Sequence, residues 1–288
     1  MPVGGLSSFV DKSESGLPAI GKNQNIERAA PFAGKTAPAS DLATVDYGQR
    51  LKQWFRKLLS EPEFPNQEQI VILHAMADRL LEEVEVLTTG STCYIEANQK
   101  KRRPNPLHEP LLGLIVGDPG TGKSRVIKWL VRMFEEAMMW THGVEFVCIA
   151  FQNRVAHAMK GHTMHSDGEI RIGTQNYAAM LESRDIDSLF TKNENKRVVI
   201  IDEVFMIPDT LFESFAYNYA EAAPRSSANP YFMRPDGERR IFGGLNCLMF
   251  GDMHQLPPIP ASGALFNPPG NRPKYNVLDI FGPRSQIP

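Results

Sequence analysis

One run of residues in this chain has the types and spacing that suit the binding of a nucleoside triphosphate. Residues 117–124 satisfy the pattern G-x-x-x-x-G-K-[ST]. Its glycines let the backbone curl so that N–H groups point at phosphate oxygens, beside the positive end of the next helix. Lys123 would reach the β- and γ-phosphates, and the Ser124 hydroxyl would ligate Mg²⁺. The predicted phosphate loop consists of Gly117, Asp118, Pro119, Gly120, Thr121, Gly122, Lys123 and Ser124.

A second chemical feature is an acidic pair that follows an apolar stretch. Asp202 and Glu203 come directly after Val198–Ile201. Ligands sit at the carboxyl ends of parallel strands, so Asp202 could hold the Mg²⁺ shell while Glu203 polarises an attacking water. Such a pair can also be a plain solvated turn. Together with the phosphate loop, it favours hydrolysis of the nucleotide over binding alone.

The elements that must position these residues alternate between strands and helices. Short apolar stretches at 111–116, 144–150, 198–201 and 245–250 read as strands, and helical patterns follow the first two. Thr210 and Glu213 suggest a capping box that opens a further helix. The pattern predicts an α/β fold with a mostly parallel sheet and helices on both faces.

Four regions follow from composition and periodicity. Residues 1–43 show no sustained hydrophobic periodicity, which predicts a flexible tail. Residues 44–110 hold two helical patterns, near 47–60 and 66–87, and a polar, basic connector. Residues 111–266 form the P-loop ATPase domain, and 267–288 a proline-rich tail.

The composition limits which other classes of protein this chain could belong to. The 42% hydrophobic residues allow a sizeable core, and a formal charge of −2 gives no global attraction to nucleic acid. Three scattered cysteines do not make a disulfide framework, and Cys148 and Cys247 fit buried free thiols. No apolar run is long enough to span a membrane, and no signal peptide is evident. We therefore expect an intracellular protein, with the nucleus as one option.

Several further segments resemble one family of motors. The segment 251–258 (GDMHQLPP) looks like the third helicase motif of the petite-integration-frequency (PIF) helicases and their relatives in Helitron transposons and the RecD group. The segments 161–166 (GHTMHS) and 202–207 (DEVFMI) are similar to that family's G-x-T-x-H-S segment and second motif. These motifs lie in the family's order over residues ~64–266.

The resemblance implies a RecA-like domain of a superfamily 1 helicase, which moves 5′→3′ on single-stranded DNA using ATP and Mg²⁺. Such helicases serve DNA repair and recombination. By the same resemblance, Gln69 would bond the adenine edge and Gln255 would sense the γ-phosphate. Thr163, His165 and Ser166 would lie along the DNA.

The chain departs from the family at two motifs and in its extent. Residues 151–156 (FQNRVA) stand where the family has P-T-G-x-A-A, and Phe205 replaces its usual serine. The chain ends at residue 288, which leaves no room after Gln255 for the second motor domain. That domain would supply an arginine and half of the DNA track, in cis or in trans; Arg272 and Arg284 lie in the tail and suggest no such role.

Other residues admit two interpretations. His162 and His165, three residues apart, could be metal ligands, although we expect this less than a role on DNA. His254 could be a plain loop imidazole. The run Lys100–Arg103 could be a nuclear-targeting or nucleic-acid-binding patch or a solvated connector, and Trp129 and Trp140 fit the core. Arg239 and Arg240 fit either phosphate steering or a turn.

We therefore expect the first motor domain of a PIF-type DNA helicase. The rival hypothesis is a truncated, non-motor module that binds ATP with negligible turnover. An unrelated P-loop ATPase, such as a kinase or an AAA-type protein, is disfavoured by the G-D-x-x-Q-L-P-P segment.

Overall fold

A computed structural model describes residues 46–89, 93–95, 102–104, 110–170, 183–222 and 240–255. The predicted tails at 1–43 and 267–288 and most of the basic connector lie outside the described residues, as does Arg239. Among the described helices, none has the length and apolar character needed to cross a membrane.

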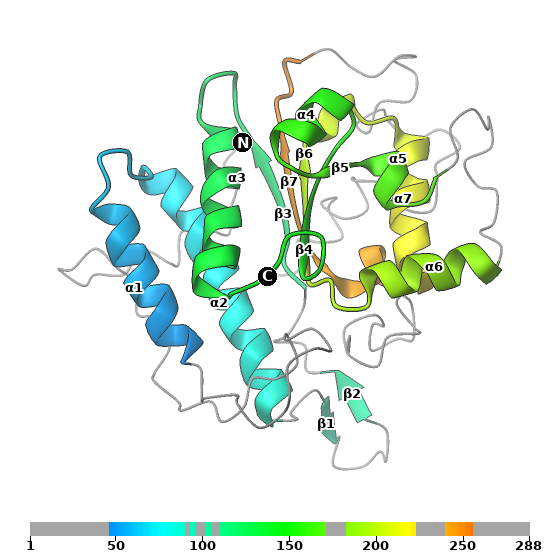
Figure 1. Cartoon of the computed structure of the whole chain (residues 1–288), viewed down its shortest axis with the longest axis horizontal. Coiled ribbons are helices and arrows are strands. Elements are labelled where there is room, and N and C mark those ends of the chain that lie inside the picture. Colours follow the sequence, from blue (N-terminus) through cyan, green and yellow to red (C-terminus); the bar gives the residue numbers. More distant parts are fainter. Residues whose placement is uncertain are drawn as a thin grey trace.

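The centre of the molecule is a parallel five-stranded sheet with the order β3-β7-β6-β4-β5. Its strands are β3 (Leu112–Val116), β4 (Phe146–Ala150), β5 (His162–Thr163), β6 (Val198–Asp202) and β7 (Asn246–Gly251). The carboxyl ends of these strands lie along one edge of the sheet (Figure 1). The α/β fold with a parallel sheet is therefore confirmed.

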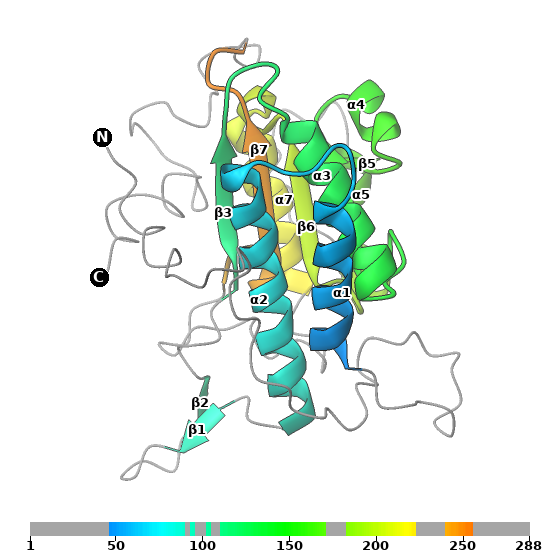
Figure 2. The ribbon, with the colours of Figure 1, turned by 90° about the vertical axis from the view of Figure 1, so that its left-hand side faces the viewer.

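One face of the sheet is covered by α1 (Tyr47–Leu59), α2 (Gln67–Thr89) and α3 (Lys123–Arg132), which run side by side in both views (Figure 1, Figure 2). Alternate strand residues such as Phe146, Cys148 and Ile200 point into this first core. Trp129 and Trp140 are buried in it as expected, with 4% and 3% of their surfaces exposed.

The other face carries α5 (Met164–Asp167), α6 (Ser183–Asn193) and α7 (Asp209–Ala222) (Figure 1). The intervening strand residues, among them Val147 and Ile201, pack with α7 in a second core. Because neighbouring strand residues point to opposite faces, β3, β4, β6 and β7 each contribute to both cores. Helices on both faces are therefore confirmed.

Three expected details differ in the structure. Helix α7 begins at Asp209, one residue before Thr210, so Thr210 lies inside the first turn and does not precede the helix as predicted; the Asp209 Oδ1 accepts the N–H of Thr210. Part of the predicted connector is a strand, β2 (Arg102–Pro104), which pairs antiparallel with β1 (Cys93–Ile95). The helix after the phosphate loop continues past α3 as a π-helical turn over Met133–Ala137.

Candidate nucleotide-binding site

The predicted phosphate loop joins the end of β3 to the start of α3. Gly120 and Gly122 have φ values of +82° and +89°, a conformation that glycine adopts without steric cost. The Lys123 ammonium donates to the carbonyl oxygens of Gly117 and Asp118, the latter at 2.9 Å. It therefore lies within the curl of the loop, where the backbone N–H groups and the helix end favour an anion.

Gln69 lies directly against this loop. Asn66 and Gln69 form a capping box at the start of α2: each side-chain oxygen accepts the other residue's backbone N–H, at 2.9 and 3.0 Å. The Gln69 Nε2 also donates to the Thr121 carbonyl at 3.1 Å. A Cβ on Gly122 would come within 2.6 Å of that nitrogen, so a glycine is required for this close approach.

The acidic pair follows β6. Asp202 is buried, with 7% of its surface exposed, and its Oδ1 accepts the N–H of Glu203 at 2.9 Å. Burial raises the pKa of Asp202, although the Glu203 N–H and the Lys123 charge oppose this effect. Burial and the Asp202 charge raise the pKa of Glu203. The solvated-turn alternative is therefore excluded for Asp202.

The loop after β7 lies between the phosphate loop and the acidic pair, because β7 lies between β3 and β6. The Gly117 N–H donates to the Gly251 carbonyl at 3.2 Å, which joins the two loops at their bases. Asp252 is fully buried and accepts the N–H of His254 at 2.8 Å. The His254 Nε2 lies 3.7 Å from the Asp118 carboxylate, with both side chains largely exposed.

Phe205 contacts this same loop. An added Cβ on Gly251 would lie 2.4 and 2.6 Å from Cδ2 and Cε2 of the Phe205 ring, and 3.0 Å from Val204. The residue that departs from the family's second motif therefore packs against the glycine that opens the third.

Three buried oxygens at this edge have no hydrogen-bond partner among the described residues: Glu203 Oε2, Asp252 Oδ2 and Gln255 Oε1. Buried polar atoms are rarely left unpaired, so such a group of acceptors suits a bound ligand. Carboxylate, amide and hydroxyl oxygens are the ligands that Mg²⁺ and its water shell prefer. The residues present therefore fit a hydrated magnesium ion beside a triphosphate.

Sequence reasoning assigned no role to Asp252. Its signal was available, since Asp252 follows an apolar strand in the same way as Asp202. The close approach of His254 to Asp118 and the contact of Phe205 with Gly251 depend on strand order, which sequence spacing does not specify.

The residues expected on DNA lie at the same sheet edge but beyond β4. Thr163 caps the short helix α5, and its Oγ1 accepts the Ser166 N–H at 3.3 Å. The half-buried His165 ring has its centroid 6.4 Å from that of Phe151, and burial lowers its pKa. Ser166 is exposed. Their contact with DNA remains a prediction.

The other open interpretations are partly resolved. His162 bonds Asp167, and no group of three or more metal-ligating side chains occurs within the described ranges. Cys148 and Cys247 are buried free thiols. Arg240 is buried, with 4% of its surface exposed, so it does not project into solvent towards a phosphate.

The sheet order, the glycine-rich loop that begins α3 and the acidic end of β6 define a P-loop NTPase domain of the α/β class. A family model described as an AAA domain matches residues 105–261. That match covers more than half of the chain, and the chain belongs to this family. The G-D-x-x-Q-L-P-P segment disfavours an AAA-type protein, whereas the description of the matched family carries the AAA name.

Similar proteins cover only part of the chain. GTPase Der from Chlamydia trachomatis serovar L2 is 33% identical over 76 residues, which are 26% of this chain and 16% of the relative. The Pif1 helicase from Bacteroides in complex with ADP-AlF3 and ssDNA aligns with a TM-score of 0.37 and 24% identity, over 52% of this chain and 30% of that one. The Pif1 helicase from Candida albicans aligns with a TM-score of 0.43 and 19% identity, over 68% of this chain and 34% of that one. The chain thus spans about a third or less of these proteins, and the family assignment rests on the domain match.

Proposed function

We propose that this chain is the first motor domain of a PIF-type DNA helicase, which hydrolyses ATP as it moves 5′→3′ on single-stranded DNA. The observation that carries the proposal is the meeting of Lys123, the acidic pair and the Asp252–Gln255 loop at the ends of adjacent strands. These are the residues of the first, second and third motifs that resemble the helicase family.

Magnesium fits the oxygen donors at this edge. Ser124, exposed in the first turn of α3, would ligate the ion directly, and Asp202 would hold its water shell. When bound, Mg²⁺ neutralises charge on the β- and γ-phosphates. The proposed ligands therefore come from the two strand ends that flank β7.

The protein's own groups act mainly by position and charge. Lys123 would exchange the loop carbonyls for phosphate oxygens, which are stronger acceptors for an ammonium. Glu203, with its unpaired Oε2, would orient the attacking water and accept its proton. The Gln255 amide would bond the γ-phosphate and so distinguish ATP from ADP.

Gln69 retains the capacity to bond adenine. Its oxygen accepts one N–H and its nitrogen donates one bond within the protein. An amide offers two lone pairs and two N–H groups, so one acceptor site and one donor site remain for a base edge. Because the same amide touches Thr121, base recognition would be sensed by the phosphate loop.

The proposed partners are single-stranded DNA and a second RecA-like domain, in cis in a longer chain or in trans. An arginine from such a domain is worth roughly 10³–10⁵ in rate in related phosphate chemistry. The alternative is a non-motor ATP-binding module with negligible turnover.

The test is steady-state ATP hydrolysis by this chain, with and without an oligo-dT strand, beside Lys123→Ala. A rate that rises with DNA and disappears in the variant supports the motor proposal. Unwinding of a duplex with a 5′ tail, compared with a 3′ tail, tests the direction.

Two results would count against the motor. Tight Lys123-dependent ATP binding without DNA-stimulated turnover would favour the binding module. An absence of nucleotide binding in the parent chain would contradict both functions.

A further inference from the structure

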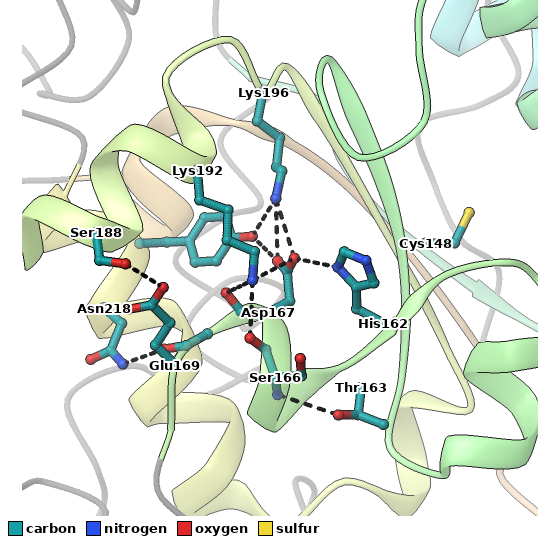
Figure 3. Close-up of polar contacts among 12 residues, drawn as sticks. Cys148, His162, Thr163, Ser166, Asp167, Glu169, Ser188, Lys192, Lys196 and Asn218 are labelled. Carbon is teal, nitrogen blue, oxygen red and sulfur yellow. Dashed lines mark hydrogen bonds and ion pairs between the residues drawn. The ribbon is translucent and has the colours of Figure 1, made fainter. Parts of the chain in front are cut away.

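Asp167 is the centre of a buried polar cluster outside the nucleotide site (Figure 3). We propose that Asp167 is a positioning residue that fixes the segment Thr163–Ser166 for contact with single-stranded DNA. This inference rests on the proposed function, because it assumes that the segment binds DNA.

The Asp167 carboxylate is bonded from several elements at once. It has no exposed surface and accepts from His162 Nδ1 at 3.0 Å, from Lys196 Nζ at 3.3 and 3.4 Å, and from the Tyr219 hydroxyl. The Lys192 ammonium lies 3.4 Å away. These donors come from β5, from α6, from the residues before β6 and from α7. A buried charge held in this way has a single favourable place in the fold.

The backbone of the same segment is tied down as well. Lys192 Nζ donates to the carbonyls of Ser166 at 3.0 Å and Asp167 at 3.2 Å. The Asn218 amide donates to the Gly168 carbonyl at 2.8 Å. Figure 3 shows these bonds converging on the segment from the side of α6 and α7.

The opposite side of the segment carries the proposed DNA contacts. Ser166 is exposed, while Thr163 and His165 are half-buried at the carboxyl edge of the sheet. Helix α5 has 4 residues, which is too short to be stable by itself. Its orientation, and that of these side chains, therefore depends on the bonds to Asp167 and Lys192.

The cluster also touches the strand that ends in the acidic pair. The buried Lys196 stands just before β6, whose five residues are all buried and which ends at Asp202. One stretch of chain, from Lys196 through β6 to Asp202, thus contacts Asp167 at its start and carries the acidic pair at its end.

The test measures binding of a fluorescein-labelled oligo-dT strand by anisotropy, with Mg²⁺ and a non-hydrolysable ATP analogue present. Asp167→Asn removes a negative charge, so a purely electrostatic effect would tighten DNA binding. Loss of positioning instead weakens it, by roughly tenfold or more, because small misplacements are costly. Affinity for the ATP analogue, measured on the same samples, is expected to stay at the parent value, whereas general unfolding would lower both.

A second variant keeps the test decisive if Asp167→Asn does not fold. Lys192→Met cuts the bonds to the Ser166 and Asp167 carbonyls from a side chain that is 29% exposed. Lys128→Met, on the exposed side of α3, removes the same charge elsewhere and is the matched control. We expect a larger loss of DNA affinity in Lys192→Met than in the control.

The outcomes separate this inference from the proposed function. If the parent binds oligo-dT and Asp167→Asn binds it equally or more tightly, the positioning role is wrong and the helicase proposal stands. Equal affinities of Lys192→Met and Lys128→Met would overturn it in the same way. If the parent does not bind oligo-dT, both proposals fail.

Discussion

On the scale of a single residue, Glu203 combines three features that destabilise the fold. Its backbone has φ +54° in the left-handed region, its Oε2 is buried without a partner among the described residues, and it is adjacent to Asp202. Strain and unpaired charge of this kind persist where the surrounding structure imposes them, and they concentrate at functional sites. The acidic pair therefore has the features of a site kept for its chemistry at the expense of stability.

Glu203→Gln is expected to be less active and more stable. Losing the base should lower ATP hydrolysis by roughly 10²-fold or more. The folded-state pKa of Glu203 is raised, so ionisation destabilises the fold above that pKa and the effect disappears as pH falls. The variant should thus gain unfolding free energy at pH 7.5 and lose this gain near pH 4, measured by urea unfolding.

Glu135→Gln, an exposed change on the π-helical turn, is the control for the loss of one charge. Glu203 is not the base if its glutamine variant hydrolyses ATP at the parent rate.

Gly251 shows how closely two motifs approach. Gly251→Ala would force the new methyl group onto the Phe205 ring, and overpacking of this kind costs about 1–3 kcal/mol. Combining Gly251→Ala with Phe205→Ser, which provides a smaller side chain, should cost less than the sum of the single changes. Urea unfolding of the four proteins gives the coupling energy, and strict additivity would mean that the two residues act independently.

On the scale of elements, α1 and α2 dock through an unusual ring pair. His74 on α2 stacks on Phe55 of α1, with ring centroids 4.2 Å apart and planes 7° apart. Neither His74 nitrogen has a hydrogen-bond partner among the described residues, and burial lowers its pKa. Taking up a proton is therefore less favourable for this imidazole in the fold than in the unfolded chain, so protonation destabilises the fold.

His74→Phe is expected to make the helix pair less sensitive to acid. Because the folded pKa lies below the unfolded value, the parent loses stability as pH falls below about 6.5. The variant should gain about 1 kcal/mol at pH 7.5 from the unpaired nitrogens and more at pH 5. Urea unfolding at both pH values tests this, with the exposed His157→Gln as control. An equal gain at both pH values would show that His74 titrates normally.

Local signals explain which elements the sequence predicts. The phosphate loop and the apolar strands are encoded by neighbouring residues, and they lie within two residues of their expected places. Helix α5 and strand β5 lack such a signal, because they are held by Lys192, Lys196 and Tyr219 from later in the chain. Thr210 matched a capping pattern, but the helix begins one residue earlier, at Asp209.

In the candidate site, too, some residues are predicted by local motifs, whereas other contacts depend on the tertiary fold. Lys123 and Asp202 follow from motifs that are continuous in sequence. The contact of Gln69 with Thr121 spans 52 residues, as does that of Tyr219 with Asp167. Such contacts depend on the order of strands and helices in space, which periodicity alone does not determine.

On the scale of the whole molecule, one sheet joins two cores. Phe146, Cys148 and Ile200 point to the α1–α3 side, while Val147 and Ile201 point to the α7 side. Neither face can lose its helices without exposing strands that the other face also needs. We therefore expect the described domain to unfold as one cooperative unit.

The three tryptophans make this cooperativity measurable. Trp54, Trp129 and Trp140 all lie in the first core, so their fluorescence reports only that face. Far-ultraviolet circular dichroism reports helices on both faces, and the two urea transitions should coincide. Saturating Mg²⁺ and an ATP analogue at 100 times its dissociation constant should move both together by about 2.7 kcal/mol, but not in Lys123→Ala. Separate transitions, or a ligand shift confined to fluorescence, would mean that the α7 face folds independently of the nucleotide site.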